Sequence, residues 1–175
     1  MKSNLALLAV SLCLATFAAP AFAEETPSTK TPSESQLINI SENCSSIRQS
    51  LKLLQRSDAR ARTYFGAIYE TASSKYITPL NLRLVKNNLS SVALINLQTS
   101  LSTTRANFNA DYIDYAKSLE ELIALDCRLE PAQFYAKLES TREKRQILAE
   151  DAKTMNAMLA NSVKSVELIK ENLGD

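Results

Sequence analysis

The sequence predicts an all-α protein, an elongated antiparallel three-helix bundle or coiled coil. Three observations carry this prediction. The chain has only 2 glycines in 175 residues, whereas β-rich and Rossmann-like domains need glycine at turns and phosphate-binding loops. Hydrophobic residues make up 45% of the chain, which argues against general disorder. Apolar residues also recur at alternating steps of three and four, the pattern of a coiled coil.

Residues 1–23 are typical of a secretory signal peptide. Lys2 supplies the positive charge, residues 5–19 form an apolar run, and Ala-Phe-Ala at 21–23 provides a cleavage site. The alternative is a retained membrane anchor, but the apolar run is shorter than the roughly 20 residues that a spanning helix needs. Residues 24–35, rich in Thr, Ser, Pro and Glu, are predicted to be a disordered tether before a helical bundle domain at 36–175.

The first long helix is predicted to run without interruption from Leu37 to Ala72. Its hydrophobic seam keeps a heptad spacing with no change of phase, and polar residues fill the positions between. The seam consists of Leu37, Ile40, Cys44, Ile47, Leu51, Leu54, Asp58, Ala61, Phe65, Ile68 and Ala72.

The segment from Pro79 to Asp126 is less regular and leaves two interpretations open. Residues 94–122 keep the heptad spacing, but the leucines at 80–89 do not settle on one face. In the favoured interpretation a short fourth helix begins at Pro79, folds across the tip of the bundle, and ends at a break near 87–91. The other is one continuous helix over 79–126.

A last long helix is predicted from Pro131 to Leu173. Pro131 suits the first turn, where its missing N–H is not needed, and Gly174 suits the position after the last turn. A short turn at 128–130 makes this helix antiparallel to the preceding one, which gives the three-helix bundle. A dimeric coiled coil is the alternative.

Cys44 and Cys127 are the two cysteines that follow the predicted signal peptide. An even number of cysteines in an exported chain predicts one intramolecular disulfide, with free thiols or bridges between chains as the alternatives. Such a bond closes a long loop and stabilises the fold by roughly 4 kcal/mol in the chain-entropy model.

Polar residues occupy some positions of the hydrophobic seams, and they predict a buried polar layer. Counting from the predicted disulfide and from the turn at 128–130 places Asp58 level with Arg145, with Arg142 one turn away, and with Tyr112 and Tyr115 beside them. The sharper interpretation is a buried ion pair that sets the register, and the plainer one is long side chains that reach water.

Arg105 is the fourth residue assigned to this layer. It falls level with Gly66, where a missing side chain leaves room for a guanidinium group. Separately, Tyr64, Tyr69 and Tyr76 recur near the predicted tip and form a candidate contact patch, with packing beneath the short helix as the alternative.

Composition excludes several classes of function. With no histidine, the chain has no Ser-His-Asp triad, no His-ligated zinc and no histidine pH switch. Adjacent carboxylates such as Glu120 and Glu121 point in different directions on a helix, so we expect no catalytic site, no metal and no cofactor. Lys and Arg total 20 against 19 Asp and Glu, and loss of Lys2 on cleavage brings the net charge to zero, which predicts no nucleic-acid or anionic-lipid partner.

The signal peptide, the Cys44-Ser-Ser-Ile helix, the segment Asp58-Ala-Arg-Ala-Arg62, and Asp126-Cys127 followed by Pro131-Ala-Gln-Phe-Tyr135 together resemble a group of sequences. They are similar to uncharacterised predicted secreted helical, coiled-coil-like bacterial proteins with one cysteine pair. The resemblance implies a bacterial origin and an extracytoplasmic helical fold, and it implies no activity.

The sequence thus predicts a secreted or periplasmic, non-enzymatic helical bundle. We expect it to serve as a protein-interaction or structural module of the cell envelope or exterior, with an unknown protein or a second copy of the chain as its partner. The alternative is a periplasmic holdase-type chaperone with helical arms, which needs exposed apolar or charged arms around its client.

Overall fold

The computed structural model describes residues 31–89 and 92–173, and those from Pro32 onwards belong to one compact unit. The predicted signal peptide, residues 24–30 of the predicted tether and Gly174 lie outside the described residues. All regular secondary structure in the described ranges is helical, which confirms the predicted all-α class. None of the described helices is long and apolar enough to cross a lipid bilayer.

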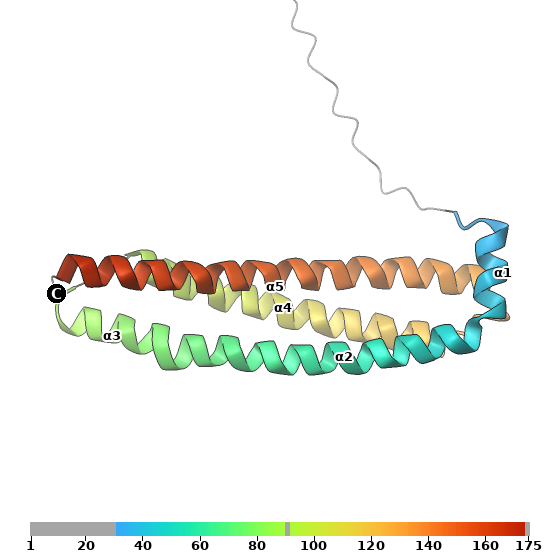
Figure 1. Ribbon diagram of the computed structural model, residues 1–175, viewed down its shortest axis with the longest axis horizontal. Coiled ribbons are helices and arrows are strands. Elements are labelled where there is room, and N and C mark those ends of the chain that lie inside the picture. Colours follow the sequence, from blue (N-terminus) through green and yellow to red (C-terminus); the bar gives the residue numbers. More distant parts are fainter. Residues whose placement is uncertain (1–30, 90–91, 174–175) are drawn as a thin grey trace, which may run out of the picture. The chain divides into compact units, whose positions relative to one another are not determined.

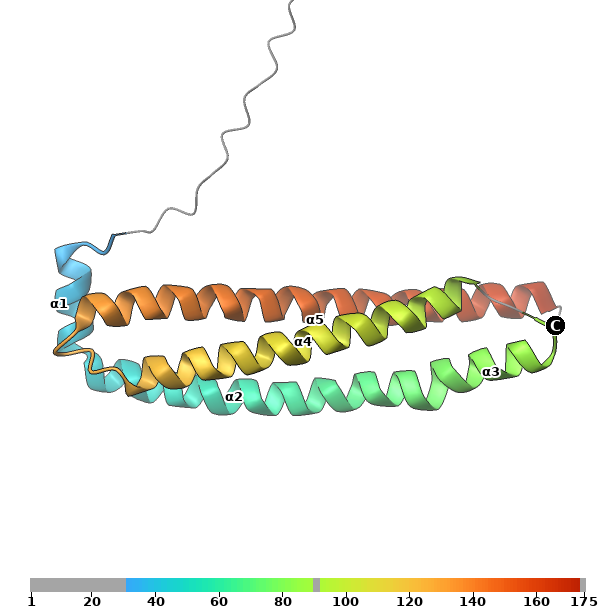
Figure 2. The ribbon, with the colours of Figure 1, turned by 180° about the vertical axis from the view of Figure 1, so that it is seen from behind.

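Long helices run alongside one another in this unit (Figures 1 and 2). Helices α2 and α3 are joined through a π-helical segment, η1, into one rod, while α4 and α5 lie along that rod in opposite directions (Figure 2). The elements are α1 (Glu34–Glu42), α2 (Cys44–Thr71), η1 (Ala72–Ile77), α3 (Thr78–Lys86), α4 (Val92–Ala124) and α5 (Pro131–Leu173).

A break at Asn43 divides the first predicted helix, so the expectation of one uninterrupted helix from Leu37 is wrong. Helix α1 begins at Glu34, two residues before the predicted start of the helical domain at residue 36. Ser33 forms a capping box with Gln36 there. At its other end the Asn43 side chain donates hydrogen bonds to the carbonyl and the side chain of Asn39. Asparagine competes with the helical backbone for hydrogen bonds, which favours a break here. As a result α1 turns away from α2 and packs against α5 (Figure 1).

The Cys44–Cys127 disulfide joins the start of α2 to the turn between α4 and α5. The two Cα atoms are 5.4 Å apart, and the bond closes a loop with a sequence separation of 83 residues. Both cysteines are buried. The pairing within one chain agrees with the sequence prediction.

The rod continues through the predicted tip, so α3 does not fold across the end of the bundle (Figures 1 and 2). Pro79 lacks an N–H and its ring crowds the carbonyl four residues earlier, which normally kinks a helix. The π-helical segment η1 lies directly ahead of it, and the N–H of Thr78 bonds to the carbonyl of Ser73, five residues back. This wider turn accommodates the proline within a continuing helix.

The chain reverses after α3, at the break that the sequence predicted near 87–91. Asn88 adopts a left-handed conformation with φ of 57°, and the N–H of Leu89 bonds to the carbonyl of Leu84 at 2.9 Å. This is a Schellman-type helix end with asparagine where glycine is commonest. One continuous helix over 79–126 is therefore excluded.

Heptad packing holds α4 against α5 and forms most of the core. Apart from Ser118 and Leu119 of α4, the buried residues of both helices recur every seven positions, as in a coiled coil. They are Leu94, Leu101, Phe108, Tyr115 and Leu122 in α4, and Phe134, Thr141, Leu148 and Met155 in α5.

The α2 seam changes phase after Asp58, contrary to the prediction. Phe65 and Ile68, expected in the core, are each 38% exposed, whereas Tyr69 is only 1% exposed. Tyr69 follows Asp58 by eleven residues, and an eleven-residue step corresponds to 3.67 residues per turn, closer to a straight α-helix than the heptad. The rod therefore presents Tyr69, then Ile77 and Leu84, towards α4 and α5.

Candidate functional site

An ion pair links the middle of α2 to α5. Arg145 donates from Nε to Asp58 Oδ2 at 2.8 Å and from Nη2 to Asp58 Oδ1 at 3.0 Å. This two-contact geometry is the strongest arrangement of arginine with a carboxylate. The Asp58 side chain is 17% exposed and that of Arg145 is 51% exposed, so the pair lies at the edge of the core rather than inside it. The predicted meeting of the two residues is present, but the predicted full burial is not.

Tyr115 of α4 completes the polar layer. Its hydroxyl donates to Asp58 Oδ2 at 2.6 Å, and the residue is only 1% exposed. One carboxylate therefore accepts hydrogen bonds from two other helices at the same height along the bundle. Since a shift of either helix by one turn would separate these groups, the layer favours this one register.

The charges of the layer shift the pKa values of its members. Burial alone would raise the pKa of Asp58, but the hydrogen bonds from Arg145 and Tyr115, together with the charge of Arg145, lower it overall. The pKa of Tyr115 is raised by burial and then by its bond to the Asp58 carboxylate. The hydrogen bond to Asp58 raises the pKa of Arg145. At neutral pH the layer thus holds an ionised aspartate, a charged arginine and a neutral tyrosine.

A small cavity of about 190 Å³ adjoins this layer. Arg62 covers one side, with its guanidinium carbon 4.6 Å from the centre of the Tyr112 ring and Nη2 3.4 Å from Asn109 Oδ1. Phe65 and Phe108 line the apolar side. Because Asp58 already accepts three hydrogen bonds, it is poorly placed to act as a general base, so the layer can hold register more readily than perform chemistry.

Arg142 and Arg105 do not belong to the layer, which corrects their assignment. Arg142 forms a surface ion pair with Glu139 on its own helix, and its side chain is 64% exposed. Arg105 forms an ion pair with Glu70 at the surface of α2. A Cβ atom added to Gly66 would meet nothing within 4 Å, so the arginine does not occupy space left by the glycine. Both arginines have long side chains that reach water, as in the alternative to a buried ion pair.

The three tyrosines of the predicted contact patch do not form one surface. Tyr64 and Tyr76 are 65% and 68% exposed, but Tyr69 lies in the core, which corrects its assignment. Its hydroxyl donates to Asn156 Oδ1 at 3.0 Å and to the carbonyl of Ala152. Tyr69 therefore joins α2 to α5, and burial raises its pKa.

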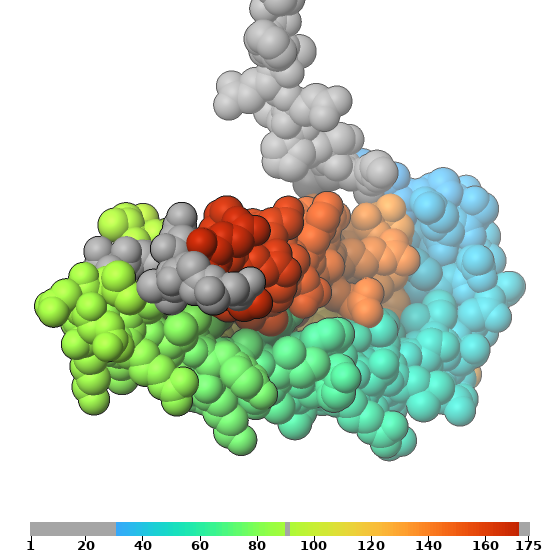
Figure 3. Space-filling view, turned by 60° about the vertical axis from the view of Figure 1, so that its left-hand side comes forward, coloured from blue at the N-terminus to red at the C-terminus, as the bar shows by residue number. Residues whose placement is uncertain are grey.

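An apolar groove opens between the rod, α4 and α5 near the chain reversal. Its cavity of about 410 Å³ is lined mainly by Tyr76, Leu80, Leu159, Val163 and Val166, and we call these five residues the tip groove. Figure 3 views the molecule with this end brought forward, where α3 in green and the end of α5 in red both reach the surface. Further large apolar side chains near this end are exposed: Leu82, Val85, Leu89, Val92, Ile95 and Leu168.

Buried and half-buried hydrogen bonds brace the helices at two levels of the bundle, and the pattern of apolar residues did not predict them. Asn81 of α3 donates to Gln98 of α4, and Gln98 donates to Thr78 Oγ1 at 3.0 Å. Ser118 and Thr141 pair across α4 and α5 at 2.8 Å. A polar residue on a predicted hydrophobic seam, as at Gln98 and Thr141, was the available signal for both pairs.

Two carboxylates face each other between α4 and α5. Burial, and then the charge and hydrogen bonding of Asp111, raise the pKa of Asp151. Within the described residues no group of three or more Cys, Asp or Glu side chains is placed to hold a metal ion. Because the two carboxylates repel each other when both are ionised, the pair lowers the stability of the folded protein.

No family model, curated protein or solved structure matches this chain. The resemblance to secreted helical bacterial proteins stays a prediction.

Proposed function

We propose that the protein is an exported, non-enzymatic interaction module of the cell envelope or exterior, and that the tip groove is its binding surface. In this proposal the α2–η1–α3 rod, α4 and α5 act as one antiparallel three-rod bundle that presents the groove at one end. The observation that carries the proposal is the tip groove itself, where the rod, α4 and α5 leave large apolar side chains exposed around one cavity. Contiguous apolar surface of this kind marks interaction sites in soluble proteins.

The groove favours a helical apolar partner. Its two long walls are the rod, with Tyr76 and Leu80, and α5, with Leu159, Val163 and Val166. The α5 residues follow a spacing of three and four, so they present one stripe along the groove. An amphipathic helix with apolar residues at the same spacing can lie in such a groove and bury both surfaces.

Two features support a location outside the cytoplasm, secreted or periplasmic. Residues 1–23 have the pattern of a signal peptide, and Cys44 lies at bonding distance from Cys127. Structural disulfides persist in oxidising compartments.

A periplasmic holdase-type chaperone is the second candidate. The exposed apolar residues of α3 and of the start of α4 favour it, because they extend the apolar surface beyond a single groove. A holdase needs such a surface to hold unfolded clients of varied sequence. The interaction module needs one defined partner instead.

The test compares two aspartate substitutions in exposed apolar residues. Val163→Asp places a charge at the tip groove, whereas Leu129→Asp, 80% exposed in the turn beside the disulfide, is the matched control. Envelope proteins captured by the wild-type chain should be lost with Val163→Asp and retained with Leu129→Asp. Equal capture by both variants would overturn the assignment of the groove.

A client assay separates the two candidate functions. A holdase should suppress the aggregation of several unrelated denatured proteins, and Val163→Asp should weaken that suppression. An interaction module should leave their aggregation unchanged. Light scattering, with and without reductant, shows whether the captured partner is a second copy of the chain.

A further inference from the structure

Four basic residues of α2 share one face. Arg48, Lys52, Arg56 and Arg60 follow each other at four-residue steps, and side chains at this spacing lie above one another on a helix. Lys52, Arg56 and Arg60 are exposed, and Arg48 is half-buried. We call these four residues the basic face. Like charges at this spacing destabilise a helix, so the arrangement has a cost that a function could offset.

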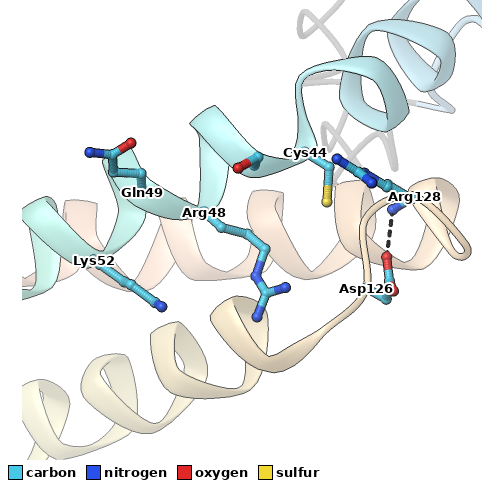
Figure 4. A pocket seen from close by; sticks show the side chains of 7 residues that line it. Cys44, Arg48, Gln49, Lys52, Asp126 and Arg128 are labelled. Atoms are coloured by element: carbon cyan, nitrogen blue, oxygen red, sulfur yellow. Dashed lines mark hydrogen bonds between the residues drawn. The ribbon is translucent and has the colours of Figure 1, made fainter.

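Within residues 31–89 and 92–173 no residue of the basic face forms an ion pair. Other basic residues of the bundle do, among them Arg105 and Arg145. Figure 4 shows Arg48 and Lys52 extending from α2 towards the end of α4, into a cavity of about 480 Å³. Arg48 Nε is buried there without a hydrogen-bond partner. The face is therefore not neutralised by the fold.

Few carboxylates lie near the basic face. Asp126 lines the cavity of Figure 4, but its Oδ1 accepts a hydrogen bond from the backbone N–H of Arg128 at 2.9 Å. Glu120 lines the neighbouring cavity beside Lys52 and Arg56. Both carboxylates belong to the α4 side, whereas the outer side of α2 carries none. Between Cys44 and Tyr69 the single acidic residue is Asp58, which Arg145 already neutralises.

Two exposed apolar residues stand in line with the outer arginines. Leu53, Arg56, Arg60 and Tyr64 are spaced by three, four and four, so they lie along one line on the surface of α2. Leu53 is 59% exposed and Tyr64 is 65% exposed. An anionic membrane interface attracts basic side chains to its phosphate groups and accepts leucine and tyrosine at the headgroup boundary, so it can contact both kinds of residue.

We propose that the outer surface of α2 binds an anionic lipid surface. Lys52, Arg56 and Arg60, the exposed residues of the basic face, contact the phosphate groups, and Leu53 and Tyr64 enter the boundary between headgroups and acyl chains. A nucleic acid would satisfy the cations but would leave Leu53 without an apolar partner, so the lipid surface fits both observations. The nearly neutral net charge of the chain predicted no such partner, because a sum over all residues conceals their uneven placement. This surface lies on α2, apart from the tip groove, so the two proposals stand or fall separately.

Vesicle co-sedimentation tests the proposal with a chain that starts at Glu24. Omitting residues 1–23 removes their apolar run and keeps the whole compact unit from Pro32 onwards. The chain should sediment with vesicles that contain one-third phosphatidylglycerol and remain in solution with pure phosphatidylcholine. Binding should weaken steeply as salt is raised, because the attraction is screened.

Matched triple substitutions identify the surface. Lys52→Gln, Arg56→Gln and Arg60→Gln together should weaken binding on the order of 100-fold, since each basic residue near an anionic surface contributes about fivefold. The control, Arg83→Gln, Lys153→Gln and Lys164→Gln, changes the net charge equally at exposed positions elsewhere and should change binding little. Circular dichroism and thermal unfolding verify that both variants fold.

Three outcomes would overturn the proposal. These are equal losses in the two triple variants, equal binding to neutral and anionic vesicles, and binding to duplex DNA with no binding to anionic vesicles. A separate variant, Leu53→Ser, should weaken vesicle binding several-fold at a salt concentration where the charges are screened. An unchanged affinity of Leu53→Ser for vesicles at that salt concentration would show that Leu53 does not enter the membrane.

Discussion

Asp58 and Arg145 are 87 residues apart in the sequence, yet their side chains meet through two hydrogen bonds that join α2 to α5. Tyr115 brings α4 to the same carboxylate. The Asp58 carboxylate therefore links the α2–η1–α3 rod, α4 and α5 at one level. Its removal should affect stability more than the removal of any other charged residue described above.

We predict that Asp58→Ala lowers the free energy of unfolding by about 1–3 kcal/mol, because it leaves the buried Tyr115 hydroxyl without its acceptor. Arg145→Ala should have a smaller effect, since that side chain is half exposed and solvent screens its charge. Urea denaturation measures both values. Arg142→Ala, whose ion pair lies at the surface, is the control and should change stability by less than about 0.5 kcal/mol.

The stabilisation by Asp58 should depend on pH. Its pKa in the folded protein lies below the ordinary value of 3.8, so the folded state favours the ionised form. The contribution is complete above the ordinary pKa and is lost as the pH falls through the lower folded value. The stability difference between wild type and Asp58→Asn should therefore be constant from pH 7 to about 5 and shrink below about 4. A difference that grows on acidification would contradict this sign.

Asp151→Asn should stabilise the protein at neutral pH. Burial and Asp111 raise the pKa of Asp151, so the folded state disfavours its charge, and stability is lost as the pH rises through the ordinary and then the folded pKa. Removal of the charge should raise the free energy of unfolding by about 0.2–0.5 kcal/mol at pH 7, as for other like-charge pairs near a surface. The gain should vanish at pH 3, where wild-type Asp151 is protonated. Paired urea titrations at the two pH values measure it.

Gly66→Ala should stabilise the protein by about 0.5–1 kcal/mol. Glycine within a helix is destabilising relative to alanine, and the new methyl group would meet no atom within 4 Å. Thermal unfolding checks this. A loss of stability would contradict the open space found beside Gly66.

The disulfide should contribute about 4 kcal/mol, because it closes a loop with a sequence separation of 83 residues. Cys44→Ser with Cys127→Ser should lower the urea midpoint accordingly. Reduction of the wild-type protein should lower it by a similar amount and should leave the double variant unaffected. A difference much below 1 kcal/mol would mean that the unfolded chain is already compact.

Periodicity predicted most of α4 and α5, since Leu101, Tyr115 and Leu122 in one helix, and Phe134 and Leu148 in the other, repeat every seven residues. It could not reveal the break at Asn43, which depends on local side-chain hydrogen bonds. Nor could it predict the continuous rod through Pro79, because the spacing of apolar residues does not indicate where a π turn forms.

The same reasoning predicted part of the candidate site. Counting residues from the predicted disulfide and the turn at 128–130 brought Asp58 and Arg145 together correctly, because neither helix is interrupted between those positions and the disulfide end. It misplaced Tyr69, because the phase of α2 changes between Asp58 and that residue. The tip groove was not foreseen, since its rod residues, Tyr76 and Leu80, both follow that change.

The π turn in η1 has a geometrical consequence for everything beyond it. One extra residue in a helical turn rotates the following segment by about 100° relative to an uninterrupted α-helix. Deletion of a single residue from 72–77 would swing Asn81 and Leu84 away from α4 and would carry Leu82 or Val85 inwards in their place. The winding of the single π turn in η1 thus determines which residues of α3 face α4 and which face solvent.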